Sequence, residues 1–250
     1  MAKRKREREE TYSESKKIKF INYVFEKIAN DARNEFFNIL KKNTKYSKKK
    51  SIIDIGTTPS LDDVQNIILS KIKDNKNITC LSNLNCKILF KKYPNIKKIL
   101  IGDGRNTNLP NNSFDIVHSN ATIEHVGSYK NQLLFIKECI RISKKYVFIQ
   151  TPNRFYPIDF HTILPFIHWL PKNIHRKILN IIGLNFYGLE KNLNLLSESD
   201  LISLCNELNI KNYKIIKYRL FFMTSNLILF IEKNKSNPLT TKSKDKVKSK

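Results

Sequence analysis

Glycine is scarce in this chain, with 6 glycines among 250 residues, and cysteine, methionine and tryptophan are rarer still. The four cysteines form no Cys-x-x-Cys pair and fall in predicted strands or helices: they are Cys80, Cys86, Cys139 and Cys205. This argues against a zinc site or a disulfide framework and favours buried thiols in a reducing compartment. No apolar run approaches the about 18–20 residues of a membrane span, and none follows the N-terminal charges as in a signal peptide. The sequence therefore predicts a cytoplasmic protein.

Acidic residues are also few, since 22 Asp and Glu stand against 46 Lys and Arg, a formal net charge of +24. Such an excess favours binding to the phosphates of nucleic acid. However, lysine, asparagine and isoleucine are all abundant, as the codons of an AT-rich genome would impose, and this bias explains much of the charge equally well. Residues 1–17, with Lys-Arg-Lys-Arg at positions 3 to 6, and residues 233–250 lack apolar side chains to bury. We predict a basic disordered arm and a basic disordered tail there.

Between these ends, residues 18–232 predict a single domain in which strands and helices alternate. Apolar spacing in residues 18–40 predicts one or two covering helices, and residues 41–50 read as a lysine-rich linker. Strands are expected at 51–55, 78–81, 98–101, 114–119 and 146–150, separated by helices at 61–73, 84–93 and 129–143. Strands that alternate with helices predict a parallel sheet with right-handed crossovers.

In the last third of the chain the regular alternation of strands and helices ends. Residues 160–182 are apolar, aromatic and interrupted by prolines. Ser197 is placed to begin a helix as its N-cap, with Asp200 in the first turn. Two strand-like runs follow, at 213–222 and 226–232, with a turn between them.

Polar residues gather just past the carboxyl ends of successive apolar strands. They follow the third, fourth and fifth strands, in the runs Gly102-Asp103-Gly104, Asn120 to Val126 and Thr151-Pro152-Asn153-Arg154. Open parallel sheets bind ligands at this edge, because strand ends and helix starts expose unpaired N–H groups there.

These residues resemble the Methyltransferase type 11 group of class I S-adenosylmethionine (SAM) methyltransferases, over roughly residues 50–232. The resemblance is carried by Gly102-Asp103, Leu109-Pro110, Ser113-Phe114-Asp115, Ser119-Asn120 and Glu124-His125-Val126. The run from Gln150 to Arg154 is similar to bacterial members associated with surface-glycan pathways. The resemblance implies an α/β fold with a Rossmann-like sheet of seven strands, mostly parallel with an antiparallel edge hairpin, and helices on both faces. It also implies SAM as cofactor, and a lid formed by residues 160–182.

The resemblance further implies which residues bind the cofactor. The loop after the first strand would approach the methionine end, Asp103 and Gly104 would face the adenine, and the turn after the fourth strand would lie under the sulfonium. The cofactor residues it implies are Asp54, Gly56, Thr57, Ser82, Asp103, Gly104, Ser119, Asn120 and Glu124.

Two positions depart from the family pattern. The glycine-rich loop keeps only its first glycine, Gly56, and the carboxylate that usually binds the ribose is replaced by Ser82. A neutral hydroxyl in place of a carboxylate weakens those hydrogen bonds by about 1–2 kcal/mol, which is roughly a 5- to 30-fold loss of affinity.

Candidate groups for the acceptor follow the fifth strand. Asn153, Arg154 and Tyr156 form a predicted substrate-binding set, because a guanidinium binds carboxylate or phosphate groups. Asp159 or His161 is placed to take a proton from a hydroxyl acceptor, and His125 is a further candidate general base.

His161, His168 and His175 recur every seven residues, a spacing that resembles metal ligands on one helix face. Pro165 and Pro171 would interrupt such a helix, so the sequence predicts no metal site. Residues 160–177 either pack as a plain lid or rest on a membrane surface, where nearby lysines and arginines would contact anionic lipid.

The leading hypothesis is a SAM-dependent methyltransferase acting on a small molecule, glycan or glycolipid, with a hydroxyl as the first choice of acceptor. One alternative is a nucleic-acid methyltransferase, or an RNA- or DNA-binding protein, that uses the basic ends. The other is a non-catalytic scaffold with a methyltransferase fold.

Overall fold

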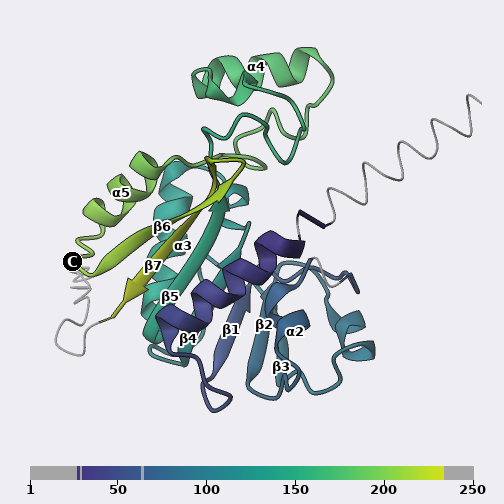
Figure 1. Ribbon diagram of the computed structural model, residues 1–250, viewed down its shortest axis with the longest axis vertical. Coiled ribbons are helices and arrows are strands. Elements are labelled where there is room, and N and C mark those ends of the chain that lie inside the picture. Colours follow the sequence, from purple (N-terminus) through teal and green to yellow (C-terminus); the bar gives the residue numbers. More distant parts are fainter. Residues whose placement is uncertain (1–26, 29, 63–64, 234–250) are drawn as a thin grey trace, which may run out of the picture.

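The computed structural model describes residues 27–28, 30–62 and 65–233, and its centre is one seven-stranded sheet (Figure 1). The strand order is β3-β2-β1-β4-β5-β7-β6. The first five strands run parallel, and β7 lies antiparallel between β5 and β6. The strands are β1 (Ile52–Ile55), β2 (Ile78–Ser82), β3 (Lys98–Ile101), β4 (Phe114–Asn120), β5 (Ser143–Pro152), β6 (Tyr213–Leu220) and β7 (Met223–Glu232). This sheet confirms the predicted fold class, including the antiparallel edge hairpin.

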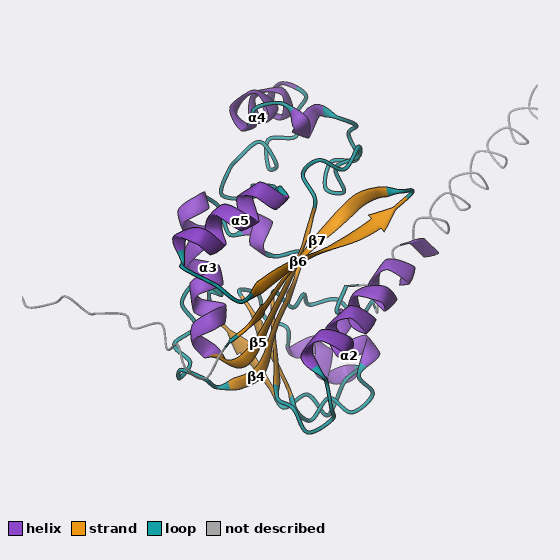
Figure 2. Ribbon diagram, turned by 60° about the vertical axis from the view of Figure 1, so that its left-hand side comes forward, coloured by secondary structure: helices purple, strands orange, loops and turns teal. Residues whose placement is uncertain are grey.

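Helices cover both faces of the sheet (Figure 2). A first helix at residues 30–44 and α2 (Ile67–Lys71) lie on one face, while α3 (Tyr129–Ile142) and α5 (Glu198–Glu207) lie on the other. Side chains of a strand point alternately to its two faces. Accordingly, Ile52 belongs to one apolar core, and Ile53 and Ile55 belong to the other.

Two helices, α3 and α5, begin where the sequence provides caps. The hydroxyl of Ser128 accepts a hydrogen bond from the backbone N–H of Asn131 at the start of α3. Ser197 and Asp200 form a reciprocal capping box at the start of α5, which confirms the predicted N-cap.

Three predictions about the first half of the chain were wrong. Of the helix expected at 61–73, the described residues form only α2, and the amide of Asn66 instead binds the backbone of Thr58 and Ser60. The helix expected at 84–93 is the short 3-10 helix η1 (Lys87–Lys91). The predicted linker is partly helical, since residues 41–44 complete the first helix.

At the other end, Lys233 was assigned to the tail but is anchored to the domain. Its backbone N–H donates to the carbonyl of Lys145 at 2.7 Å, and its Nζ donates to the carbonyl of Ser143 at 3.0 Å. The arm predicted at 1–17 and the rest of the predicted tail lie outside the described residues.

The segment after β5 lies beyond the carboxyl ends of the parallel strands (Figure 1). It contains the 3-10 helix η3 (Ile167–Trp169) and helix α4 (Lys172–Ile181). Residues 160–182 are called the lid segment below. Among the described residues, no helix has the length and apolarity needed to cross a bilayer.

Candidate active site

The turn after β1 is tight and depends on Gly56. This residue adopts a φ of +94°, and a Cβ added to it would overlap Oγ1 of Thr122, which follows β4. The Thr122 hydroxyl donates to the carbonyl of Asn120 at 3.0 Å. Gly56 therefore lets the turns after two neighbouring strands approach each other at the edge where the cofactor is predicted.

Asp54, one of the predicted cofactor residues, is paired inside the sheet. Its carboxylate lies 2.7 Å from Nδ1 of His118, its register partner on β4, and both side chains are buried. The His118 ring stacks on Phe148. The Asp54 side chain is therefore buried beneath the turn and is not exposed at its surface.

Three predicted cofactor hydroxyls already make hydrogen bonds within the chain. Thr57 donates to the carbonyl of Asp54, and Ser119 donates to the carbonyl of Ile55. Ser82, at the end of β2, accepts from the backbone N–H of Leu84. These hydroxyls hold the strand ends in place.

Asp103 follows β3 and is exposed, as a group that contacts a ligand must be. Its carboxylate accepts from Nε of Arg105 at 2.9 Å. Hydrogen bonding to Arg105 lowers the pKa of Asp103 against the opposing effect of burial. At the neighbouring Gly104, an added Cβ would lie 2.8 Å from both Ile55 and Phe135, so this glycine is required by the core beneath the loop.

The most concentrated polar group lies at the ends of β4 and β5. It brings together Glu124, His125, Asp159 and His161, here called the histidine–carboxylate cluster. His125 Nε2 lies 3.2 Å from His161 Nε2, and His161 Nδ1 lies 3.0 Å from the Asp159 carboxylate. Oε1 of Glu124 is 3.9 Å from His161 Nε2. The three residues predicted to be catalytic are therefore adjacent, although 36 positions separate His125 from His161.

Asp159 and His161 shift each other's pKa in opposite directions. Burial raises the pKa of Asp159, but hydrogen bonds from His161 and Thr162 outweigh it and bring the pKa to about 2. Burial lowers the pKa of His161, yet the hydrogen bond to Asp159 and the charges of Glu124 and Asp159 raise it overall. The Asp159 carboxylate thus stays charged and orients the ring of His161.

The predicted substrate residues build the loop after β5. Asn153 donates to the carbonyl of Thr224, and Arg154 donates to the carbonyls of His168 and Leu170. Tyr156 is buried, and its carbonyl accepts from Nε2 of His168 at 2.6 Å. These contacts fix the base of the lid segment. Two of the three residues also line cavities, Arg154 one and Asn153 another.

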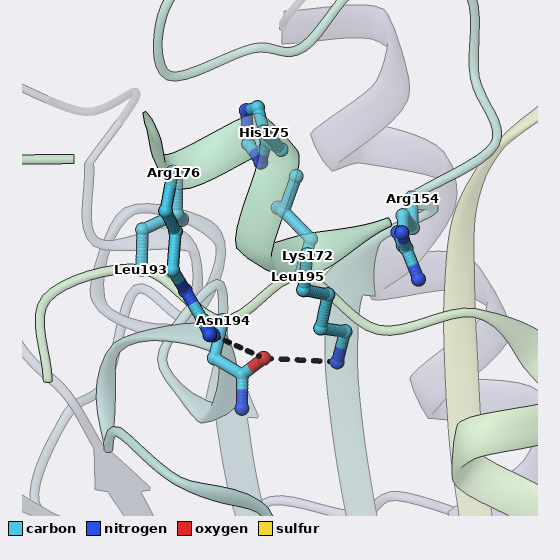
Figure 3. Close-up of a pocket in the computed structure, with 7 residues that line it drawn as sticks. All are labelled: Arg154, Lys172, His175, Arg176, Leu193, Asn194 and Leu195. Carbon is cyan, nitrogen blue, oxygen red and sulfur yellow. Dashed lines mark hydrogen bonds between the residues drawn. The ribbon is translucent and has the colours of Figure 1, made fainter. Parts of the chain in front are cut away.

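That cavity is small and lies beneath α4 (Figure 3). It is lined by Arg154, Lys172, His175, Arg176, Leu193, Asn194 and Leu195. A second cavity of about 360 Å³ lies between β7, the loop after β5 and the start of α5, with Asn153 and Ser197 in its wall. Neither of these two cavities reaches the predicted cofactor residues.

Sequence reasoning missed Asn194, which connects the cluster to the lid segment. Its backbone N–H donates to the carbonyl of Glu124, and its side chain accepts from Lys172 and Arg176 (Figure 3). Asn192, two residues earlier, accepts from His125 through its carbonyl. Backbone carbonyls carry no sequence signal, so only the structure reveals these links.

Comparisons with known proteins agree on the fold. Residues 78–149 match the model of a family described as "Methyltransferase domain". This segment of the chain therefore resembles a methyltransferase domain. A SAM-dependent methyltransferase from Archaeoglobus fulgidus matches with a TM-score of 0.53 and 15% identity, covering 84% of this chain and 99% of that one. No curated protein matches the sequence.

Two further solved structures support the same methyltransferase fold. A putative S-adenosyl-L-methionine-dependent methyltransferase from Methanococcus maripaludis matches with a TM-score of 0.51 and 16% identity, covering 84% of this chain and 91% of that one. A SAM-dependent methyltransferase from Aquifex aeolicus matches with a TM-score of 0.50 and 12% identity, covering 79% and 88%. At these identities the likeness establishes the fold alone.

Proposed function

We propose that this protein is a SAM-dependent methyltransferase that methylates a hydroxyl group of a small molecule or glycan. The observation that carries the proposal is the histidine–carboxylate cluster. It lies at the carboxyl edge of a sheet with the methyltransferase fold, at the same edge as the turn of the predicted cofactor residues Gly56 and Thr57. A base at this position is needed for a hydroxyl acceptor, whose proton must leave as the oxygen gains the methyl group.

The residues at the sheet edge fit SAM in two respects. Gly56 has no side chain, so the turn after β1 presents its backbone, and Asp103 offers an exposed carboxylate after β3. We assign the methionine end of SAM to the Gly56 turn and Asn120, and the adenine to Asp103. When bound, SAM supplies an electrophilic methyl group.

The chain's own contribution is position and proton acceptance. Holding acceptor and methyl donor in line supplies much of the rate enhancement in such transfers. Asp159 fixes the orientation of His161, and the carbonyl of Asn192 fixes that of His125. The cluster is therefore preorganised to receive the proton of a bound hydroxyl.

For the acceptor, we favour a glycan or glycolipid. The run from Gln150 to Arg154 is similar to glycan-pathway members, and the lid segment exposes large apolar side chains that suit a lipid portion. Among these are Phe160, Ile163, Phe166, Trp169 and Ile181.

Calorimetric titration of SAM and of its demethylated product into the full chain tests the cofactor assignment. We expect binding in the micromolar range, weakened at least tenfold by Asp103→Ala. Asp74→Ala is the matched control, because Asp74 is also an exposed carboxylate paired with a base two residues later. Absence of SAM binding at millimolar concentration would refute the proposal and favour the non-catalytic scaffold.

Transfer of labelled methyl groups from SAM to nucleotide sugars, glycolipids and RNA tests the acceptor. We expect O-methylated sugar, and a fall in rate of about 10²–10⁴-fold in His161→Ala with SAM affinity unchanged. Label on a nitrogen atom, or on RNA alone, would contradict the proposed acceptor and support the nucleic-acid alternative.

A further inference from the structure

We propose that Glu124, His125 and His161 bind a single divalent transition-metal cation. One ligand atom from each, the Glu124 carboxylate and two ring nitrogens, can be chosen so that all three lie within 4.8 Å of one another. The three residues come from two chain segments, the 3-10 helix η2 (Ile123–His125) after β4 and the lid segment after β5.

The ring of His125 is held in the tautomer that a metal ligand requires. Its Nδ1 lies 2.7 Å from the backbone carbonyl of Asn192. A carbonyl can only accept a hydrogen bond, so Nδ1 carries the proton and the lone pair of the neutral ring is on Nε2.

His161 is held in the same way by a carboxylate. Its Nδ1 lies 3.0 Å from Oδ1 of Asp159, which also accepts the His161 backbone N–H. The Nδ1 proton therefore points at Asp159, and the lone pair of Nε2 faces that of His125 across 3.2 Å. Metal-binding histidines commonly donate their second N–H to a carboxylate or a carbonyl, and both arrangements are present here.

Glu124 supplies a carboxylate oxygen with no hydrogen-bond partner among the residues that the structure describes. The residue is fully buried, and its Oε2 accepts from the Thr151 hydroxyl at 2.9 Å. Its Oε1 is buried and makes no hydrogen bond within the described residues, yet it lies 3.9 Å from His161 Nε2. A buried carboxylate oxygen left unpaired is costly, and a cation beside the two lone pairs would satisfy all three groups.

The spacing suits a transition metal. Two metal–nitrogen bonds of about 2.0–2.1 Å that meet at a tetrahedral angle place their nitrogens roughly 3.3 Å apart. The observed separation is 3.2 Å. Two imidazoles and one carboxylate favour Zn²⁺, Co²⁺, Mn²⁺ or Fe²⁺ over Mg²⁺ or Ca²⁺, which prefer oxygen ligands.

Three protein ligands leave a coordination position open, as catalytic metal sites do. We assign that position to the acceptor oxygen. Its proton would leave more readily next to a cation and would pass to solvent water, because the cation would take the Nε2 lone pairs that make His125 and His161 bases in its absence. This use of the site depends on the proposed function, whereas binding of the cation does not.

The test uses the full chain without a histidine tag, freed of metal with a chelator. Co²⁺ is titrated with visible absorption as the signal, and Zn²⁺ is titrated by calorimetry. We expect one equivalent of each to bind at micromolar concentration or tighter. His125→Ala and His161→Ala should each weaken binding at least 100-fold, and Glu124→Gln at least tenfold.

The controls separate ligation from folding. His175→Gln removes a histidine outside the cluster and should leave metal binding unchanged. Asp159→Asn keeps all three ligands but loosens His161, and should weaken binding by about 10–100-fold. Thermal melts verify that each variant folds.

Absence of Co²⁺ and Zn²⁺ binding at millimolar concentration would overturn the inference, as would binding that persists in both alanine variants. SAM titrations with and without chelator run in parallel. SAM binding without any metal binding refutes this inference alone, and metal binding without SAM binding refutes the proposed function alone.

Discussion

Nδ1 of His118 lies 2.7 Å from the carboxylate of Asp54 on the neighbouring strand, and both side chains are buried under the Gly56 turn. Removing one member of a buried hydrogen-bonded pair leaves the other without its partner, which typically costs about 1–3 kcal/mol. We therefore predict that His118→Ala lowers the free energy of unfolding by this amount, measured by urea denaturation.

The double variant Asp54→Asn, His118→Ala should lose less stability than the sum of the two single variants, because both substitutions alter the same hydrogen bond. Additive losses would show that the two side chains contribute independently.

A second prediction compares the stability cost of alanine at Gly56 with that of alanine at Gly183, the matched control. Both glycines have positive φ, +94° and +83° respectively, but an added Cβ overlaps Thr122 at Gly56 and contacts nothing within 4 Å at Gly183. Alanine at Gly183 should cost about 1–2 kcal/mol for the backbone conformation alone. Alanine at Gly56 should cost clearly more, and should also weaken SAM binding in calorimetry.

Thr122→Ala in the Gly56→Ala background should recover the part of the loss that comes from overlap with Oγ1 and Cγ2 of Thr122, after subtraction of the effect of Thr122→Ala alone. Equal losses in the two glycine variants would show that overlap at Thr122 contributes nothing.

The sheet could be predicted from the sequence because its strands are short apolar runs bounded by turn residues. α3 was also predicted almost to the residue, since its apolar spacing is regular. The start of α2 was not, because the amide of Asn66 makes hydrogen bonds to the backbone of Thr58 and Ser60, which no periodicity reveals.

The histidine–carboxylate cluster could be predicted only as separate residues. Seven-residue spacing drew attention to His161, His168 and His175, but His168 is bonded to the carbonyl of Tyr156 and takes no part in the cluster. The partner of His161 is His125, which the sheet brings close from the end of β4. The spacing of residues within one segment cannot reveal a site that is formed by two segments distant in the sequence.

The Glu138 carboxylate on α3 is hydrogen-bonded to the loop that follows Asp103, and the stability that these bonds contribute should depend on pH. Its carboxylate accepts from the backbone N–H and hydroxyl of Thr107, at 2.7 and 2.6 Å, and from Arg141 at 2.7 Å. Burial raises the pKa of Glu138, but the hydrogen bonds from Arg141 and Thr107 lower it below its usual 4.5.

A lowered pKa in the folded state stabilises the protein above the unfolded value, and this contribution is lost as pH falls through the folded value. We predict that Glu138→Gln lowers stability at pH 7 and reduces the further loss between pH 5 and pH 3, measured by thermal melts. Asp74→Asn, which changes an exposed ion pair, should alter neither quantity appreciably. If the fall in stability between pH 5 and pH 3 is the same in Glu138→Gln as in the wild type, Glu138 does not cause that fall.

The lid segment exposes apolar side chains beyond the carboxyl edge of the sheet, including Ile163 at 62% and Phe166 at 54%. Both residues have positive φ, a conformation that asparagine tolerates better than isoleucine or phenylalanine. The variant Ile163→Asn, Phe166→Asn therefore removes apolar surface without straining the fold.

If the segment rests on a membrane, wild-type protein should co-sediment with phosphatidylcholine–phosphatidylglycerol vesicles, and this variant should bind several-fold less. Phe90→Asn, on η1 away from the lid segment, is the control. Equal binding by all three proteins would assign vesicle association to charge elsewhere on the chain and leave the segment as a lid over the site.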